Sequence, residues 1–272
     1  MSGYFGRGEA IGHAGEILQG AVRREGRVEP FLVTLPMPAY RSTATACPAE
    51  EWRVTPAWKT KALEAAQLAW GGPGALTLAI DSDIAVGRGC GSSTADCVAA
   101  VRAVGDLMGV NWTPETTARL VQRAEGASDA TMFGSEPVAF LPRAGQLLRR
   151  LGAAWPAMEI AVHDLGGPMV ETLACPVPAY TGAELDEFEA LLAALERAIA
   201  AEDVPAIGGI ALRSGEIHQR HRRHEGWVDI CRKAAARGAA GVAFAHSGTV
   251  AAVLTAAEGK GNWNADSTRG RR

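Results

Sequence analysis

Glycines and hydroxyl side chains are concentrated in one short stretch of this sequence. Residues 86–96 read Val-Gly-Arg-Gly-Cys-Gly-Ser-Ser-Thr-Ala-Asp, and an Ala- and Val-rich segment follows them. Glycines let backbone N–H groups turn toward an anion without obstruction, and a helix that begins after them adds free N–H groups and a positive dipole end. The stretch therefore predicts a phosphate-binding loop followed by a helix. Its candidate phosphate-contacting residues are Gly87, Arg88, Gly89, Cys90, Gly91, Ser92, Ser93 and Thr94.

The spacing of this loop differs from the two commonest phosphate-binding motifs. No Gly-Lys-Ser/Thr follows, so it is not a Walker A loop, and its third glycine falls one residue too early for the dinucleotide fingerprint. The alternative is a tight turn capped by Ser92 or Ser93 with no ligand, although such a turn needs one glycine rather than three. Hydroxyl groups at this position can also bind Mg²⁺.

The chain that must position this loop has 272 residues, enough for one large domain or two small ones. Its hydrophobic content of 47% favours a sizeable core, and its net charge of −3 argues against a protein that coats nucleic acid. The five cysteines form no Cys-x-x-Cys pair, so we expect reduced thiols. No run resembles a signal peptide or a membrane span, which favours a cytoplasmic protein. We expect a small-molecule substrate and no nucleic-acid or membrane partner. The sequence does not determine the oligomeric state, and a homodimer is one option.

Strand-like and helix-like segments alternate in the first half, and the second half is more helical. We predict strands at residues 31–35, 75–80, 137–141 and 158–163, and helices at 58–70, after the loop, and at 114–124. An apolar stripe from Leu185 to Ile199 and residues 208–222 predict two further helices. Short apolar runs at 241–246 and 250–254 flank Ser247-Gly248-Thr249. We interpret the basic run from His218 to His224 as a solvated helix face.

The glycine-rich stretch resembles the second motif of the GHMP kinases, Pro-x-x-x-Gly-Leu-Gly-Ser-Ser-Ala. The match holds at Gly89, Gly91, Ser92 and Ser93, while Ala85 replaces the proline and Cys90 the leucine. It is more similar to the variant of one subgroup, the L-threonine kinases of cobalamin side-chain assembly, which reads Val-Gly-basic-Gly-x-x-Ser-Ser-Thr-Ala-Asp. Residues 86–89 and 92–96 fit that variant.

Further segments extend the resemblance over about residues 12–250. Residues 15–20 are similar to the subgroup's first motif, although Gly12-His13-Ala14 replaces its usual proline-containing lead-in. Residues 127–133 resemble the segment that carries the catalytic Asp of mevalonate kinase-like members. Residues 164–167 with Glu171-Thr172 resemble an Asp-x-Gly-Gly-x-Val-x-Thr stretch, residues 211–219 the Ser…Asn-Gln helix, and residues 245–250 the third motif.

The resemblance implies a role for each candidate residue. Asp129 would take the proton of the acceptor hydroxyl, Ser93 and Glu125 would bind Mg²⁺, and the loop would bind the phosphates of ATP. The substrate-side candidates are Glu16, Asp164, His246, Ser247, Gly248 and Thr249. Glu16 or Asp164 would hold a substrate ammonium, and Arg213 or the backbone of Ser247-Gly248 a carboxylate.

The residues alone leave plainer interpretations of these positions open. Glu16 could be a surface acid in a strand-turn, and Asp129 could form an Asx-turn or cap a helix. Glu125 could be an ordinary exposed helix acid, and Ser247-Gly248 a simple hairpin turn.

The fold that the resemblance implies is the two-lobed α+β GHMP kinase fold, with mixed or antiparallel sheets packed against helices. We expect an N-terminal lobe at residues 1–150, a C-terminal lobe at 151–257 and a disordered tail at 258–272. The implied function is ATP- and Mg²⁺-dependent phosphorylation of L-threonine to O-phospho-L-threonine. One alternative is a kinase for another small alcohol, such as homoserine or a specialised-metabolite precursor. The other is a non-catalytic nucleotide-binding sensor of the same fold.

Overall fold

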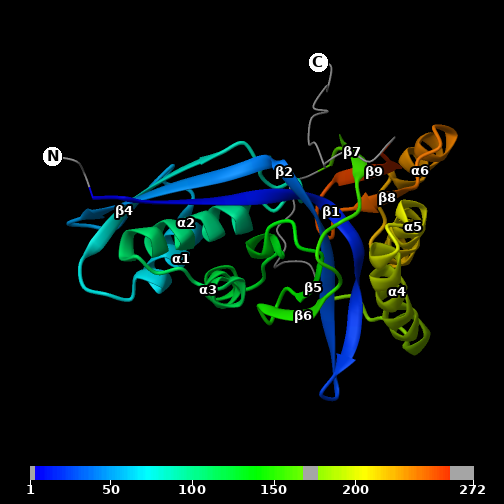
Figure 1. The fold of residues 1–272 in the computed structure, drawn as a ribbon, viewed down its shortest axis with the longest axis horizontal. Helices are drawn as coiled ribbons and strands as arrows, with labels where there is room; N and C mark the ends of the chain where they lie inside the picture. Colours follow the sequence, from blue (N-terminus) through cyan, green and yellow to red (C-terminus); the bar gives the residue numbers. More distant parts are fainter. Residues whose placement is uncertain (1–3, 168–176, 258–272) are drawn as a thin grey trace.

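A long antiparallel hairpin forms the spine of the molecule in the computed structural model, which describes residues 4–167 and 177–257 (Figure 1). Its strands, β1 (Gly6–Arg24) and β2 (Arg27–Ala49), pair from Gly6↔Ala46 to Arg24↔Arg27. The sheet built on them has the order β3-β4-β2-β1-β8-β9-β7; β5 joins it at β2, and β6 pairs with β5. The further strands are β3 (Arg53–Thr55), β4 (Ala75–Ser82), β5 (Val138–Leu141), β6 (Gln146–Arg150), β7 (Met158–Asp164), β8 (Gly241–Phe244) and β9 (Val250–Ala256). β3 and β4 run parallel and the other pairs antiparallel, so the sheet is mixed.

Three helices cover one end of the hairpin: α1 (Thr60–Trp70), α2 (Ser92–Met108) and α3 (Pro114–Glu125) (Figure 1). α2 is rich in Ala and Val because it is buried along most of its length. Its backbone also approaches β1 closely, since a Cβ on Gly8 would lie 2.1 Å from the carbonyl oxygen of Ala99. The one-turn helix η1 (Thr131–Phe133) follows α3. Because α2 is buried along most of its length, the predicted phosphate loop lies at the start of a tightly packed helix.

Two helices, α4 (Gly182–Ala200) and α5 (Val204–His221), cover the other end of the hairpin, and α6 (Trp227–Ala236) packs beside β8 (Figure 1). α4 begins with a capping box, in which Thr181 accepts from the backbone N–H of Glu184 and the Glu184 carboxylate accepts from Thr181. The predicted apolar stripe is confirmed, because Leu185, Phe188, Leu192, Leu195 and Ile199 are all buried. Phe188, Leu192, Leu195 and Ile199 share one core with hairpin residues such as Ile17 and Phe31. The hairpin therefore contributes to the packing at both ends, and the lobe boundary near residue 150 stays a prediction.

The α+β fold class is confirmed, and so are most predicted elements, whereas β1, β3, β6, η1 and α6 were not predicted. The interpretation of the basic run as solvated is wrong for His218, which is 3% exposed and packs beside Phe244 and His246.

The four cysteines among the described residues carry free thiols. Among residues 4–167 and 177–257, no helix combines the length and the apolar character that a membrane crossing requires. The predicted tail at 258–272, as well as Glu171 and Thr172, lies outside the described residues.

Candidate active site

The glycine-rich loop lies at the N-terminus of α2 and turns through three left-handed residues. Gly87, Gly89 and Gly91 have φ angles of 70°, 83° and 72°, values that side-chain-bearing residues rarely adopt. The turn between β8 and β9 supports the loop from behind, because the backbone N–H of Thr249 donates to the carbonyl oxygen of Arg88 at 3.0 Å. A Cβ on Gly89 would lie 2.7 Å from that of Ala245. The second and third motifs, about 150 residues apart in the sequence, therefore form one packed unit.

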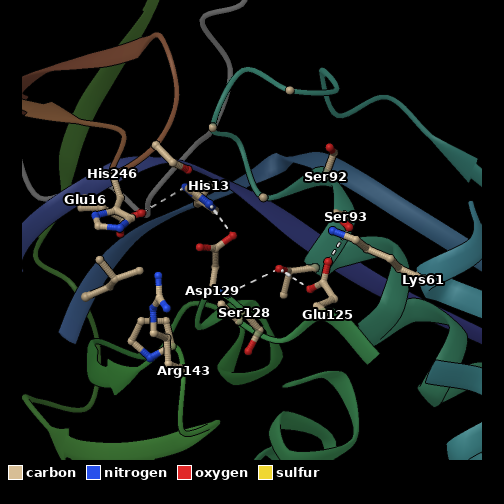
Figure 2. A pocket seen from close by; sticks show the side chains of 18 of the residues that line it. His13, Glu16, Lys61, Ser92, Ser93, Glu125, Ser128, Asp129, Arg143 and His246 are labelled. Atoms are coloured by element: carbon tan, nitrogen blue, oxygen red, sulfur yellow. Dashed lines mark hydrogen bonds and ion pairs between the residues drawn. The ribbon is translucent and has the colours of Figure 1, made fainter. Parts of the chain in front are cut away.

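A carboxylate and two hydroxyls meet at the first turn of α2. The Ser93 hydroxyl donates to one oxygen of Glu125, and the Thr94 hydroxyl donates to the other at 2.8 Å (Figure 2). Glu125 is 4% exposed, so the alternative of an exposed helix acid is wrong. Burial raises the pKa of Glu125 to about 7, against the effect of the two hydroxyls and of Lys61. This set of oxygen atoms is of the kind that Mg²⁺ prefers.

A histidine that the sequence did not single out lies beside Asp129. The Nε2 atom of His13 is 3.1 Å from Oδ2 of Asp129, in the middle of the site (Figure 2). The Nδ1 atom of His13 lies 3.2 Å from the backbone nitrogen of Gly15. Burial alone would raise the pKa of Asp129, but the charge of His13 and its contact hold that pKa below its usual value. Asp129 is thereby kept in the form that can accept a proton.

Glu16 and His246 lie on the other side of Asp129 from the Ser93–Glu125 pair (Figure 2). Glu16 is 1% exposed, which rules out a surface acid, and burial raises its pKa to about 7. His246 contacts the Oε1 atom of Gln19 through Nδ1 at 3.2 Å. Burial is the main cause that lowers the pKa of His246 to about 4, which makes the ring neutral near pH 7.

One cavity of about 510 Å³ joins these groups. Eleven of the candidate residues line it: Glu16, Gly87, Gly89, Gly91, Ser92, Ser93, Thr94, Glu125, Asp129, His246 and Ser247. The proposed phosphate, metal, base and substrate positions therefore share one continuous space.

The other predicted residues do not line this cavity. Arg88 lies 3.4 Å from Asp164 in an ion pair, and Asp164 accepts at 2.7 Å from the hydroxyl of Thr249. Cys90 is buried, with its carbonyl oxygen accepting from the N–H of His13, and a Cβ on Gly248 would meet the backbone of Arg88. These residues brace the loop from behind.

The suggested carboxylate ligand Arg213 is also engaged elsewhere. It makes a two-pronged ion pair with Glu187, at 2.5 and 3.1 Å, and a further ion pair with Glu216 at 2.8 Å. Its guanidinium belongs to the contact between α4 and α5 and does not line the cavity.

Several cavity-lining residues were missed in the sequence, among them His13, Lys59, Lys61, Arg143 and Tyr180. Lys59 is buried against Asp96 of α2 at 2.5 Å, and Asp96 also accepts from Ser42 at 2.6 Å. One signal was available, since lysine is scarce in this chain and two lysines stand together at the predicted start of α1. No comparable signal marks Arg143 among many arginines.

One segment of the chain, which contains the glycine-rich loop, matches a known protein family. Residues 57–136 match the family model of the GHMP kinases N-terminal domain. No match was found among curated protein sequences.

Solved structures with a similar fold cover most of the chain. The mevalonate kinase of methicillin-resistant Staphylococcus aureus has a TM-score of 0.62 and 18% identity over 93% of this chain and 91% of its own. A putative homoserine kinase of Listeria monocytogenes has a TM-score of 0.64 and 15% identity, covering 92% and 86%. The mevalonate diphosphate decarboxylase of Enterococcus faecalis has a TM-score of 0.62 and 16% identity, covering 93% and 89%. The chain therefore has the α+β GHMP kinase fold, and its glycine-rich loop, Glu125 and Asp129 all lie in the segment that matches the N-terminal domain of the GHMP kinases.

Proposed function

We propose that this chain is a cytoplasmic, ATP- and Mg²⁺-dependent kinase that phosphorylates the side-chain hydroxyl of L-threonine. The observation that carries the proposal is the shared cavity, in which a glycine loop at a helix N-terminus and a low-pKa carboxylate, Asp129, face the same space. Phosphoryl transfer requires mainly positioning and charge neutralisation, and this arrangement offers both.

The proposed reaction uses the loop, the Ser93–Glu125 pair and Asp129 in turn. The loop and the first turn of α2 would hold the β- and γ-phosphates of ATP. The acceptor hydroxyl oxygen would attack the γ-phosphorus while the bond to the β–γ bridging oxygen breaks and ADP leaves. Asp129 would receive the hydroxyl proton. Ser93 and Glu125 would hold Mg²⁺, which when bound neutralises charge on the phosphates.

The subgroup resemblance of the loop supports L-threonine as the acceptor and O-phospho-L-threonine, in the cobalamin side-chain pathway, as the product. Homoserine is a second candidate, because a solved homoserine kinase of Cytophaga hutchinsonii, as well as the Listeria protein, has a similar fold. Both candidates are α-amino acids that carry a side-chain hydroxyl.

A direct assay tests this proposal. Purified protein with ATP and Mg²⁺ is offered L-threonine, L-homoserine, L-serine and mevalonate, and ADP release and the phosphorylated product are measured. We expect the highest kcat/KM for L-threonine. Preference for homoserine would overturn the substrate and keep the kinase. ATP binding without transfer to any alcohol would overturn the kinase and favour a nucleotide sensor.

A further inference from the structure

The cavity wall on the far side of Asp129 from the Ser93–Glu125 pair offers hydrogen-bond acceptors to a ligand. Glu16 lies on this wall, and its Oε2 atom has no hydrogen-bond partner among the described residues. A buried carboxylate oxygen without a donor is costly. A ligand with N–H or O–H groups would remove that cost.

The protonation of His246 is fixed by a short chain of hydrogen bonds. The side-chain Nε2 of Gln19 donates to the carbonyl oxygen of Phe244 at 3.1 Å, so its Oε1 atom is the one that faces His246. An amide oxygen only accepts, which requires the proton of the neutral imidazole to sit on Nδ1. The Nε2 atom of His246 is left as an acceptor on a ring that lines the cavity.

The complementary positive charge on this side of the cavity comes from Arg143. It follows β5 in the chain, lines the same cavity, and lies on the same side of Asp129 as His246 (Figure 2). Its charge is close enough to contribute to the lowered pKa of His246. A guanidinium presents parallel N–H groups that match the two oxygens of a carboxylate.

We propose that Arg143 binds the carboxylate and that Glu16 and His246 bind the ammonium of the acceptor, so that this site selects α-amino acids with a side-chain hydroxyl. This inference rests on the proposed kinase function and adds to it the residues that select the substrate class. An ammonium has three N–H groups and therefore suits a wall of acceptors. The side-chain hydroxyl would then face Asp129, which lies between this wall and the Ser93–Glu125 pair.

Two truncated substrates separate the roles of these residues. 1-Amino-2-propanol is threonine without its carboxylate, and 3-hydroxybutyrate is threonine without its ammonium. For Arg143→Met we expect kcat/KM for L-threonine to fall about 10- to 100-fold, with little change for 1-amino-2-propanol and for the KM of ATP. Arg143→Lys should recover part of the loss. For Glu16→Gln we expect a loss with threonine and with 1-amino-2-propanol but not with 3-hydroxybutyrate.

The control is Arg149→Met, which removes an exposed arginine paired with Glu196 on the surface and should change neither substrate's kinetics. Equal losses of Arg143→Met with threonine and 1-amino-2-propanol would overturn the assignment. A loss confined to the KM of ATP would also overturn it and would place Arg143 on the nucleotide phosphates.

Calorimetric binding of L-threonine in the presence of a non-hydrolysable ATP analogue separates this inference from the proposed function. Arg143-dependent binding without phosphoryl transfer would support the assignment while the kinase proposal fails. Efficient phosphorylation of an alcohol that has no carboxylate, without binding of any amino acid, would support the kinase while the assignment fails.

Discussion

The two sides of the cavity satisfy their polar groups in different ways. The side that we propose binds the phosphates (the phosphate side) contains Lys59, Ser93, Thr94 and Glu125; its Glu125 carboxylate accepts from Ser93 and Thr94, and Lys59 is paired with Asp96. The side that we propose binds the substrate (the acceptor side) contains Glu16, Arg143 and His246, and its Glu16 retains a buried oxygen without a hydrogen-bond partner among the described residues. Behind that wall, both ring nitrogens of His218 also lack one.

This difference indicates how each side prepares for its ligand. Internally bonded groups hold the phosphate side in one geometry before a ligand arrives, which suits a site that works by positioning. An unpaired buried polar group costs about 1–3 kcal/mol. A ligand that supplies the missing partner recovers that free energy, so the proposed acceptor side would favour ligands with matching donors over analogues that lack them.

The largest effect is expected at Asp129, where the two sides meet. Asp129→Asn keeps the shape of the side chain but removes the proton acceptor, so we expect kcat to fall about 10²- to 10⁴-fold with ATP affinity retained. Its charge also raises the pKa of His13 against the effect of burial, so that pKa should fall in the variant. Steady-state kinetics and NMR titration of the His13 ring measure the two effects. Near-normal turnover would show that Asp129 is not the base.

Glu125 tests the phosphate side through both activity and stability. With a pKa of about 7 in the folded state and 4.5 as its ordinary value, the folded protein retains a proton that the unfolded chain loses. Stability therefore falls as the pH rises from about 4.5 to about 7 and stays lowered above it. Glu125→Gln should remove this penalty, which stabilises the Mg²⁺-free protein by about 1–3 kcal/mol at pH 8, and should raise the Mg²⁺ concentration needed for turnover at least about 10-fold.

Urea unfolding at pH 5 and pH 8 without Mg²⁺, and a Mg²⁺ titration of activity, check this prediction. Glu196→Gln, which changes an exposed carboxylate in a surface ion pair, is the matched control. Equal destabilisation of Glu125→Gln at both pH values would contradict the prediction and would indicate that the hydrogen bonds to Ser93 and Thr94 require the ionised carboxylate.

The two sides also differ in how far the sequence predicts them. The loop from Gly87 to Thr94 and the helix after it were predicted because glycines, hydroxyls and an Ala-rich run act on neighbouring residues. The contact of His13 with Asp129 joins residues 116 positions apart, and only the folded sheet brings them together. Local patterns carry no information of that kind.

The missed elements have a similar physical cause. β1 contains Gly6, Gly8, Gly12, Gly15 and Gly20, and glycine weakens the strand signal of a sequence. The structure explains Gly8 by the close approach of α2.

Asp164 and Thr249 were predicted to contact the substrate because they lie in motif-like segments, yet they hold Arg88 and the loop from behind. Motif membership thus identified the neighbourhood of the site but not the direction of each side chain.

The smallest effect is expected at His218, behind the acceptor wall. Burial, and then the nearby charges of His246, Arg222 and His221, lower the pKa of His218 to about 3, from 6.5 as its ordinary value. The unfolded chain therefore gains a proton below about pH 6.5 that the folded protein does not bind, so stability is lost as the pH falls from 6.5 toward 3. His218→Met fills a similar volume without a titrating group. We expect it to be about 1–2 kcal/mol more stable than the native protein at pH 5 and close to it at pH 8.

Denaturant unfolding of the native protein and of His218→Met at pH 5 and pH 8 measures this difference in stability. All other titrating groups are the same in the two proteins, so their pH dependence cancels. If His218→Met destabilises the protein equally at pH 5 and pH 8, His218 makes hydrogen bonds that stabilise the fold, and the contrast between the two sides of the cavity does not extend behind the acceptor wall. If His218→Met is more stable than the native protein at pH 5 and its KM for L-threonine is unchanged, then only the unpaired atoms that line the cavity affect substrate binding. Glu16 would then be the residue of the acceptor side on which the difference depends, because its unpaired oxygen belongs to a side chain that lines the cavity.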